Sequence, residues 1–140
     1  MFTAQVYRVM IGCLGGIMEE VHQAKMVVKE WNDENAKQTG KVFLPFDWSD
    51  NSDIINYVDI IVGIVGDWVD NARFIDKCIE SGKKVVILYQ KNHDPNNSIP
   101  GEIKTIRDFI ERIKPNTSCF SFDARDEFKD LLLSYFMSIE

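Results

Sequence analysis

The sequence predicts an α/β fold of three layers, in which helices cover both faces of a doubly wound parallel sheet. Two features of the chain support this prediction. Five short apolar runs, rich in β-branched residues, alternate with longer segments whose apolar residues recur every three or four positions. The apolar runs are nearly continuous, as expected for parallel strands buried on both faces. We expect five strands in the order 2-1-3-4-5.

Each element follows from its local pattern. The first helix presents one apolar face at spacings of three and four residues, and Gly40 ends it. Gly82 ends the helix after the third strand, Pro115 stops the next one, and Asp123 is a plausible N-cap for the last. The predicted strands are 6–13, 42–46, 58–65, 84–89 and 119–122, with a short helix within 50–57. The aromatic residues expected in the core are Phe2, Phe120, Phe122, Phe128 and Phe136.

Length and composition limit the class of protein. The 140 residues are expected to form a single α/β domain, 1–140. The net charge of −6 argues against nucleic-acid or anionic-membrane partners, because both favour a basic face. The cysteines, Cys13, Cys78 and Cys119, are odd in number and form no CxxC pair, which predicts free thiols in the cytoplasm. No apolar run approaches the roughly 20 residues that span a bilayer.

Glycine, acidic and aromatic residues follow the predicted strands, where the carboxyl ends of a parallel sheet meet at one edge. Gly15 follows the first strand, Trp48 follows the second, and Asp67, Asp70 and Asn71 follow the third. Glycine lets a backbone approach a ligand, Trp can stack on a base, and Asp can bind a hydroxyl. We therefore predict a ligand site at this edge.

Each of these residues also has a purely structural interpretation. The glycines after the first strand fit neither GxGxxG nor a P-loop, and the glutamates Glu19 and Glu20 would repel a phosphate. Trp48 could pack on a helix, and Asp67 or Asp70 could cap the next helix.

Metal and histidine chemistry find little support in the sequence. His22 is expected on the solvent side of the first helix, and His93 lies in a polar loop. Because the two histidines are separated and no CxxC pair is present, we expect no metal site. We also expect no cofactor. Lys83 and Lys84 precede a strand and are expected at a solvated edge.

Several segments together resemble a known bacterial group. They are Tyr7–Cys13, Glu19-Glu20-Val21, Trp31-Asn32, Leu44-Pro45 with Trp48-Ser49, Val58–Ile64 and Ser81–Tyr89. Over this stretch the chain resembles nucleoside 2-deoxyribosyltransferase-like and TIR-like domains. The resemblance implies a flavodoxin-like fold that binds a nucleoside or nucleotide and often cleaves or exchanges an N-glycosidic bond.

One position departs from the pattern of that group. Its catalytic Glu, early in the helix after the third strand, is replaced here by Phe74, and the preceding Ser-Gly-Thr is absent. Phe cannot act as a nucleophile or base. Asp76 would point away from that side of the helix, whereas Asp70 lies one turn earlier on the same side and is the better substitute. Whether the chain is an enzyme stays open.

The sequence is consistent with two functions. The first is a nucleoside- or nucleotide-binding domain with degenerate N-glycosidic-bond activity, in which Asp70 is the candidate catalytic residue. The second is a non-catalytic module that forms homo-oligomers or binds other proteins, for which solvent-facing Trp68 and Phe74 would be evidence. A flavin-binding role is weaker, because Leu14–Ile17 holds no Ser or Thr for a phosphate loop.

Overall fold

The computed structural model describes residues 2–15, 18–47, 52–65, 72–90, 106–123 and 125–139. It confirms a five-stranded parallel sheet in the order β2-β1-β3-β4-β5. The strands are β1 (Gln5–Gly15), β2 (Lys41–Asp47), β3 (Ile60–Val65), β4 (Lys84–Gln90) and β5 (Ser118–Phe122). The helices are α1 (Met18–Thr39), α2 (Ala72–Glu80), α3 (Ile106–Ile113) and α4 (Arg125–Ser138), with 3-10 turns η1 (Ser52–Asn56) and η2 (Lys114–Asn116).

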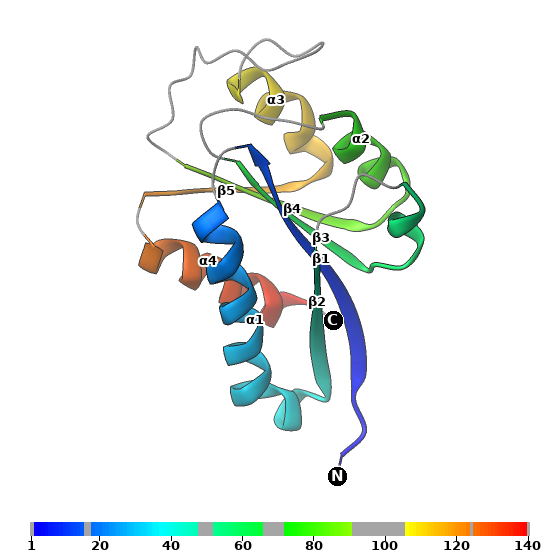
Figure 1. The fold of residues 1–140 in the computed structure, drawn as a ribbon, viewed down its shortest axis with the longest axis vertical. Helices are drawn as coiled ribbons and strands as arrows, with labels where there is room; N and C mark the ends of the chain where they lie inside the picture. The colour runs from blue at the N-terminus through cyan, green and yellow to red at the C-terminus, as the bar shows by residue number, and fades with distance from the viewer. Residues whose placement is uncertain are drawn as a thin grey trace.

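Helices cover the sheet from both sides, which gives the three predicted layers. Helices α1 and α4 lie on one face, and α2 and α3 lie on the other (Figure 1). Each face has its own core cluster, because successive side chains of a strand point to opposite faces. Within the described residues, no helix is both long and apolar enough to cross a membrane. The single-domain organisation over 1–140 stays a prediction.

The face under α1 and α4 is closed by large apolar side chains. The predicted stripe of α1 is confirmed, since Val21, Ala24, Val28 and Trp31 are all buried. Phe43 of β2 is fully buried among three rings, with centroid distances of 5.3 Å to Tyr7, 4.8 Å to Trp31 and 4.6 Å to Phe136. Aromatic contacts of this kind join the sheet to both helices.

A side chain of α1 also holds the outer edge of the sheet. The Asn32 amide nitrogen donates to the Phe43 carbonyl at 2.8 Å, and the Phe43 N–H donates to Asn32 Oδ1 at 2.9 Å. In a parallel ladder the N–H and C=O of one residue point to the same neighbour. Both polar groups of Phe43 therefore point away from β1, and Asn32 satisfies them.

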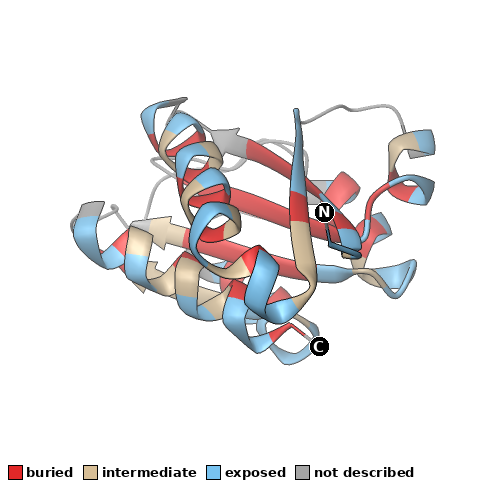
Figure 2. Ribbon diagram, turned by 90° about the horizontal axis from the view of Figure 1, so that it is seen from below, coloured by how far each residue is buried: buried red, intermediate tan, exposed pale blue. Residues whose placement is uncertain are grey.

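The opposite face is closed over β3, β4 and β5. Its cluster joins Phe74, Ile75 and Cys78 of α2 to Phe109 and Ile113 of α3, above the inner strands. In Figure 2 the buried residues concentrate in the strands and on the inner sides of the helices, while exposed residues cover the outer sides. The glycines that follow α1 and α2 have the positive φ predicted for helix ends, 71° at Gly40 and 80° at Gly82.

Strand β2 and the start of β1 are left uncovered on this same face. The exposed fractions are 49% for Val6, 43% for Leu44 and 39% for Phe46. Their shared face follows from the register, which pairs Val6 with Val42, Arg8 with Leu44 and Met10 with Phe46. The described part of the β2–β3 connection contains only the short turn η1, so no full helix from it covers these strands.

The predicted aromatic core is largely confirmed, with one error. Phe122, Phe128 and Phe136 are buried, and Phe120 packs against the core with partial burial. Phe2, however, is 49% exposed. It precedes β1, outside the ladder that carries side chains into either helix layer. The prediction that Phe2 belongs to the core is wrong for that reason.

Candidate functional site

The carboxyl ends of all five strands lie at one edge of the sheet, because every strand pair is parallel. The chain runs from β1 outward to β2 and then returns to β3 on the other side of β1. This reversal between β1 and β3 is the topological switch point, where open α/β sheets bind ligands. The predicted place for the site is therefore present in the fold.

Most of the predicted site residues fall outside the described part of the chain. Trp48, Asp67, Asp70 and Asn71 all lie there, as do Trp68 and His93. Gly15 is described, and it ends β1 opposite Val65 after a shift of register at Cys13. Gly15 thus lies at the switch point, and the positions of the other four residues stay predictions.

Two glycines face each other across the switch point, a feature that sequence reasoning missed. Gly12 of β1 is directly opposite Gly63 of β3, and Gly63 is opposite Ile87 of β4. Both glycines are buried, and alternation places them on the face that α2 and α3 cover. Adjacent glycines in central strands leave the sheet surface without side chains, as where a ligand or another backbone approaches closely.

The start of α1 brings a buried carboxylate to the same edge. Glu20 is in the first turn of α1 and is only 8% exposed. It precedes Ala24, Val27 and Trp31 at helical spacing, so it belongs to the stripe that faces the sheet. No described residue hydrogen-bonds its Oε2 atom. A buried carboxylate oxygen can accept a hydrogen bond from a hydroxyl or amino group, whereas it would oppose a phosphate.

An ion pair occupies the end of β2. Lys25 of α1 donates to Asp47 Oδ1, and the Asp47 side chain is 82% exposed. This hydrogen bond and the charge of Lys25 lower the pKa of Asp47, with a further contribution from the charge of His22. His22 is exposed, as predicted. Asp47 is therefore ionised at neutral pH, and its carboxylate is paired with the Lys25 ammonium.

The position at which the resemblance would place a catalytic Glu is buried in the helix after β3. Phe74 is only 7% exposed and belongs to the core cluster under α2 and α3. Asp76 accepts a hydrogen bond of 2.7 Å from the Arg112 guanidinium of α3. The prediction that Asp76 is a poor substitute agrees with this pairing.

Metal and thiol chemistry receive no support from the described residues. Within them, no group of three or more His, Cys, Asp or Glu side chains could hold a metal ion. Cys78 and Cys119 are free cysteines, and burial raises the pKa of each thiol to about 11. The thiolate is the nucleophile, and at neutral pH both cysteines are mainly in the protonated thiol form.

Comparison with known proteins gives the fold. No family model matches the chain, and no curated protein matches it in sequence. Staphylococcus aureus homoserine dehydrogenase resembles it with a TM-score of 0.55 and 13% identity, over 86% of this chain and 33% of that one. A de novo designed P-loop 2x3 fold protein resembles it with a TM-score of 0.50 and 11% identity, over 96% and 94%. The chain therefore spans about a third of the dehydrogenase that it matches, and both likenesses show a Rossmann-like α/β fold.

Proposed function

We propose that this protein binds a nucleoside or nucleotide at the carboxyl edge of its sheet, in the manner of the nucleoside 2-deoxyribosyltransferase-like and TIR-like domains that its sequence resembles. The observation that carries the proposal is the pair of facing glycines, Gly12 and Gly63, at the switch point between β1 and β3. Their bare backbones allow a ligand or another backbone to approach the sheet closely at that point.

The residues predicted at this edge would have the following roles. Trp48 would stack on the base or ring, and Asp67 and Asn71 would bind hydroxyls beside Gly15. Glu20 adds a buried acceptor at the start of α1. These groups suit a ligand that carries hydroxyl or amino donors. The proposal also assumes a cytoplasmic protein.

Catalysis would require a different acid from that of the domains that the sequence resembles. With Phe74 in the core, the acid of the related domains has no counterpart at its usual position. If cleavage of an N-glycosidic bond is retained, Asp70 would stabilise the positive charge that develops on the sugar. Binding requires neither Asp70 nor any other acid at that position.

A thermal melt against a nucleotide panel tests the proposal. The panel holds NAD, NADP, ATP, ADP-ribose, cyclic nucleotides and deoxynucleosides. A ligand at 100 times its dissociation constant adds about 2.7 kcal/mol of stability, which raises the Tm of a domain this size by several degrees. We expect a selective shift with one class of compound.

Matched glycine variants connect such a shift to the site. Gly63→Ala places a methyl group on the bare sheet surface, whereas Gly82→Ala changes a glycine between α2 and the start of β4, at the opposite edge of the sheet. We expect Gly63→Ala to lose the ligand shift and Gly82→Ala to retain it, while Asp70→Ala tests for cleavage of the ligand found. No shift with any compound, or equal shifts in both glycine variants, would contradict the proposal.

A second candidate function, self-association, rests on the uncovered face of β1 and β2. Val6, Leu44 and Phe46 form an exposed apolar row on that face. Solvent exposure of Trp68 and Phe74 is the evidence expected for this function. Phe74 is buried, and Trp68 lies outside the described residues.

Sedimentation velocity distinguishes this function from ligand binding. If the face joins two copies, Phe46→Glu should yield a monomer while Met26→Glu leaves the dimer intact. Met26 is a suitable control because it is 72% exposed on α1, away from the row. A wild-type protein that is monomeric at high concentration would exclude self-association.

A further inference from the structure

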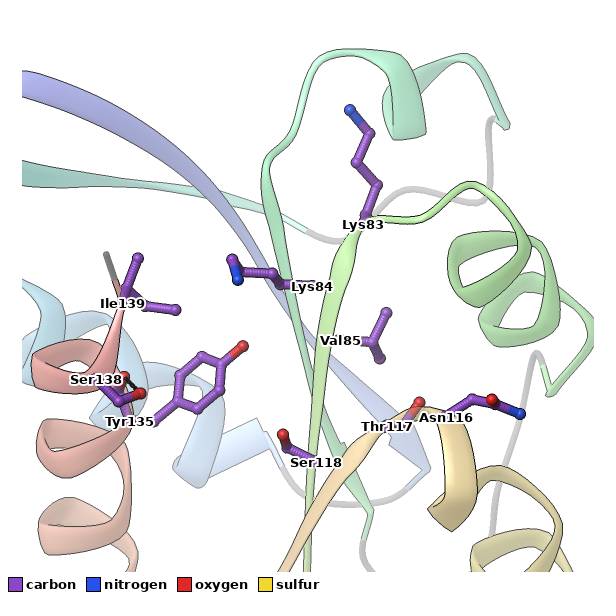
Figure 3. Close-up of a pocket in the computed structure, with 9 residues that line it drawn as sticks. All are labelled: Lys83, Lys84, Val85, Asn116, Thr117, Ser118, Tyr135, Ser138 and Ile139. Atoms are coloured by element: carbon purple, nitrogen blue, oxygen red, sulfur yellow. Dashed lines mark hydrogen bonds between the residues drawn. The ribbon is translucent and has the colours of Figure 1, made fainter.

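A cavity lies at the amino edge of the sheet, opposite the edge discussed above. Its volume is about 420 Å³, which is within the range of small-molecule sites, roughly 300–1,000 Å³. The start of β4, the junction of η2 with β5 and the last turn of α4 form its sides, and it is open to solvent (Figure 3). The residues that matter here are Lys84, Val85, Thr117, Ser118, Tyr135 and Ile139.

The charge of the cavity is positive. Lys83 and Lys84 contribute to its lining, which includes no acidic residue. No carboxylate of the described residues forms an ion pair with either lysine. Figure 3 shows Lys84 beside Ile139 and the Tyr135 ring, while Lys83 extends away from the other side chains. In a protein of net charge −6, this is a local region of positive charge.

Hydroxyl groups surround the same space. The Tyr135 hydroxyl points toward the strands between Lys84 and Val85, and Ser118 lies at the start of β5 (Figure 3). Burial raises the pKa of Tyr135 to about 12, so this hydroxyl is a donor throughout the neutral range. The Thr117 hydroxyl oxygen is buried, and no described residue hydrogen-bonds it. The cavity therefore presents several hydroxyl donors around the Lys84 ammonium.

Two carbonyl groups at and just after the last turn of α4 are hydrogen-bonded. A helix C-terminus carries partial negative charge on its free carbonyl groups. Here the Ile139 carbonyl accepts a hydrogen bond from Lys41 Nζ, and the Tyr135 carbonyl accepts one of 2.6 Å from Ser138. Both carbonyl groups are satisfied, and Lys41 adds a further cation near the cavity.

We propose that this cavity binds a small organic anion. Its phosphate or carboxylate group contacts the Lys84 ammonium and accepts hydrogen bonds from the hydroxyls of Tyr135 and Ser118. Its carbon skeleton lies against Ile139 and the Tyr135 ring, because the cavity is larger than an inorganic anion requires. The site is independent of the proposed nucleotide site, since it uses the opposite ends of the strands.

An NMR titration tests the proposal with three probes: inorganic phosphate, glycerol phosphate and citrate. We expect saturable shifts of the Thr117 and Ser118 amide signals, with an organic anion binding more tightly than inorganic phosphate. The preference between glycerol phosphate and citrate identifies the anionic group. Amide signals of Gly12 and Gly63 should not move, which separates this site from the carboxyl edge.

Two lysine variants supply the matched comparison. Lys84→Met keeps the aliphatic stem and removes the charge in the cavity, while Lys83→Met removes the neighbouring charge that extends away. Because a charged hydrogen bond is lost, we expect Lys84→Met to weaken binding about tenfold or more, and Lys83→Met about twofold or less. Tyr135→Phe keeps the ring and should weaken binding about threefold.

Unchanged amide spectra away from the cavity establish that each variant is folded. Equal weakening by Lys83→Met and Lys84→Met would show diffuse attraction and overturn the site. The absence of saturable shifts in the wild-type protein with all three probes would also overturn it.

Discussion

The two faces of the sheet differ in how completely helices cover them. On the side of α1 and α4, Tyr7, Val9 and Ile11 of β1 are at most 8% exposed. On the other side of the same strand, Val6 is 49% exposed while Met10 is fully buried. The difference arises because α2 and α3 close the face over β3, β4 and β5, and β1 and β2 extend beyond them. Burial in this fold thus depends on the helix layer above each strand as well as on the strand pattern.

The strongest test of this comparison uses two phenylalanines of β2 that point to opposite faces. Phe43 is fully buried, whereas Phe46 is 39% exposed. Phe43→Ala should lower the free energy of unfolding by about 3–5 kcal/mol, because it leaves a cavity among three aromatic rings. Phe46→Ala should lower it by about 1 kcal/mol or less. Urea unfolding measures both values, and equal losses would show that the second face is covered.

A smaller loss is expected from the side chain that closes the edge of β2. Asn32→Ala leaves the N–H and C=O of Phe43 without their partner. The expected loss is about 1–3 kcal/mol. Asp33→Ala, an exposed neighbour on α1, is the control and should change stability by about 0.5 kcal/mol or less. An Asn32→Ala value within the range of the control would mean that water replaces the amide without loss.

The two helix-ending glycines should be equivalent although they belong to different faces. Gly40 follows α1 and Gly82 follows α2, both with positive φ. An added Cβ meets only the Thr3 carbonyl oxygen, at 4.0 Å, in the first case and nothing within 4 Å in the second. Only backbone strain remains, so each Gly→Ala change should lower stability by about 1 kcal/mol. A clear inequality in thermal unfolding would show that a helix layer affects even its terminal turns.

The smallest effect is expected from the Lys25–Asp47 pair at the surface. The pKa of Asp47 is lowered from 3.8 in the folded state, so its contribution to stability is present above that value. The contribution is lost as the pH falls through the lowered value. Lys25→Met should therefore be slightly less stable than wild type near neutral pH and equal to it in strong acid. Chemical unfolding at both pH values tests this, and a difference that persists in acid would contradict the assignment to Asp47.

Much of the fold could be predicted because its signals are local. Apolar runs and helical spacing gave the strands and helices, and Gly40 and Gly82 ended α1 and α2 where expected. Phe2 was misplaced because composition alone does not reveal whether a terminal residue lies under a helix layer.

The candidate site was harder to predict because its features depend on register. Gly12 and Gly63 are fifty-one positions apart by residue number, and only the β1–β3 alignment places them opposite each other. The Lys25–Asp47 pair likewise requires α1 to pack beside β2. The burial of Glu20 could have been anticipated, since it precedes Ala24 by one helical turn. Trp48, Asp67, Asp70 and Asn71 stay predictions.

The contact between Asn32 and Phe43 has a consequence for self-templated aggregation. An exposed edge strand offers unpaired N–H and C=O groups on which another chain can form a strand. On the outer side of β2, the groups of Phe43 are occupied by Asn32, and Pro45, two residues on, has no N–H to offer. An incoming strand would have to displace the Asn32 side-chain amide from Phe43, and it could accept no hydrogen bond from Pro45. This edge of the sheet is therefore protected against amyloid-like growth even though its apolar face is open.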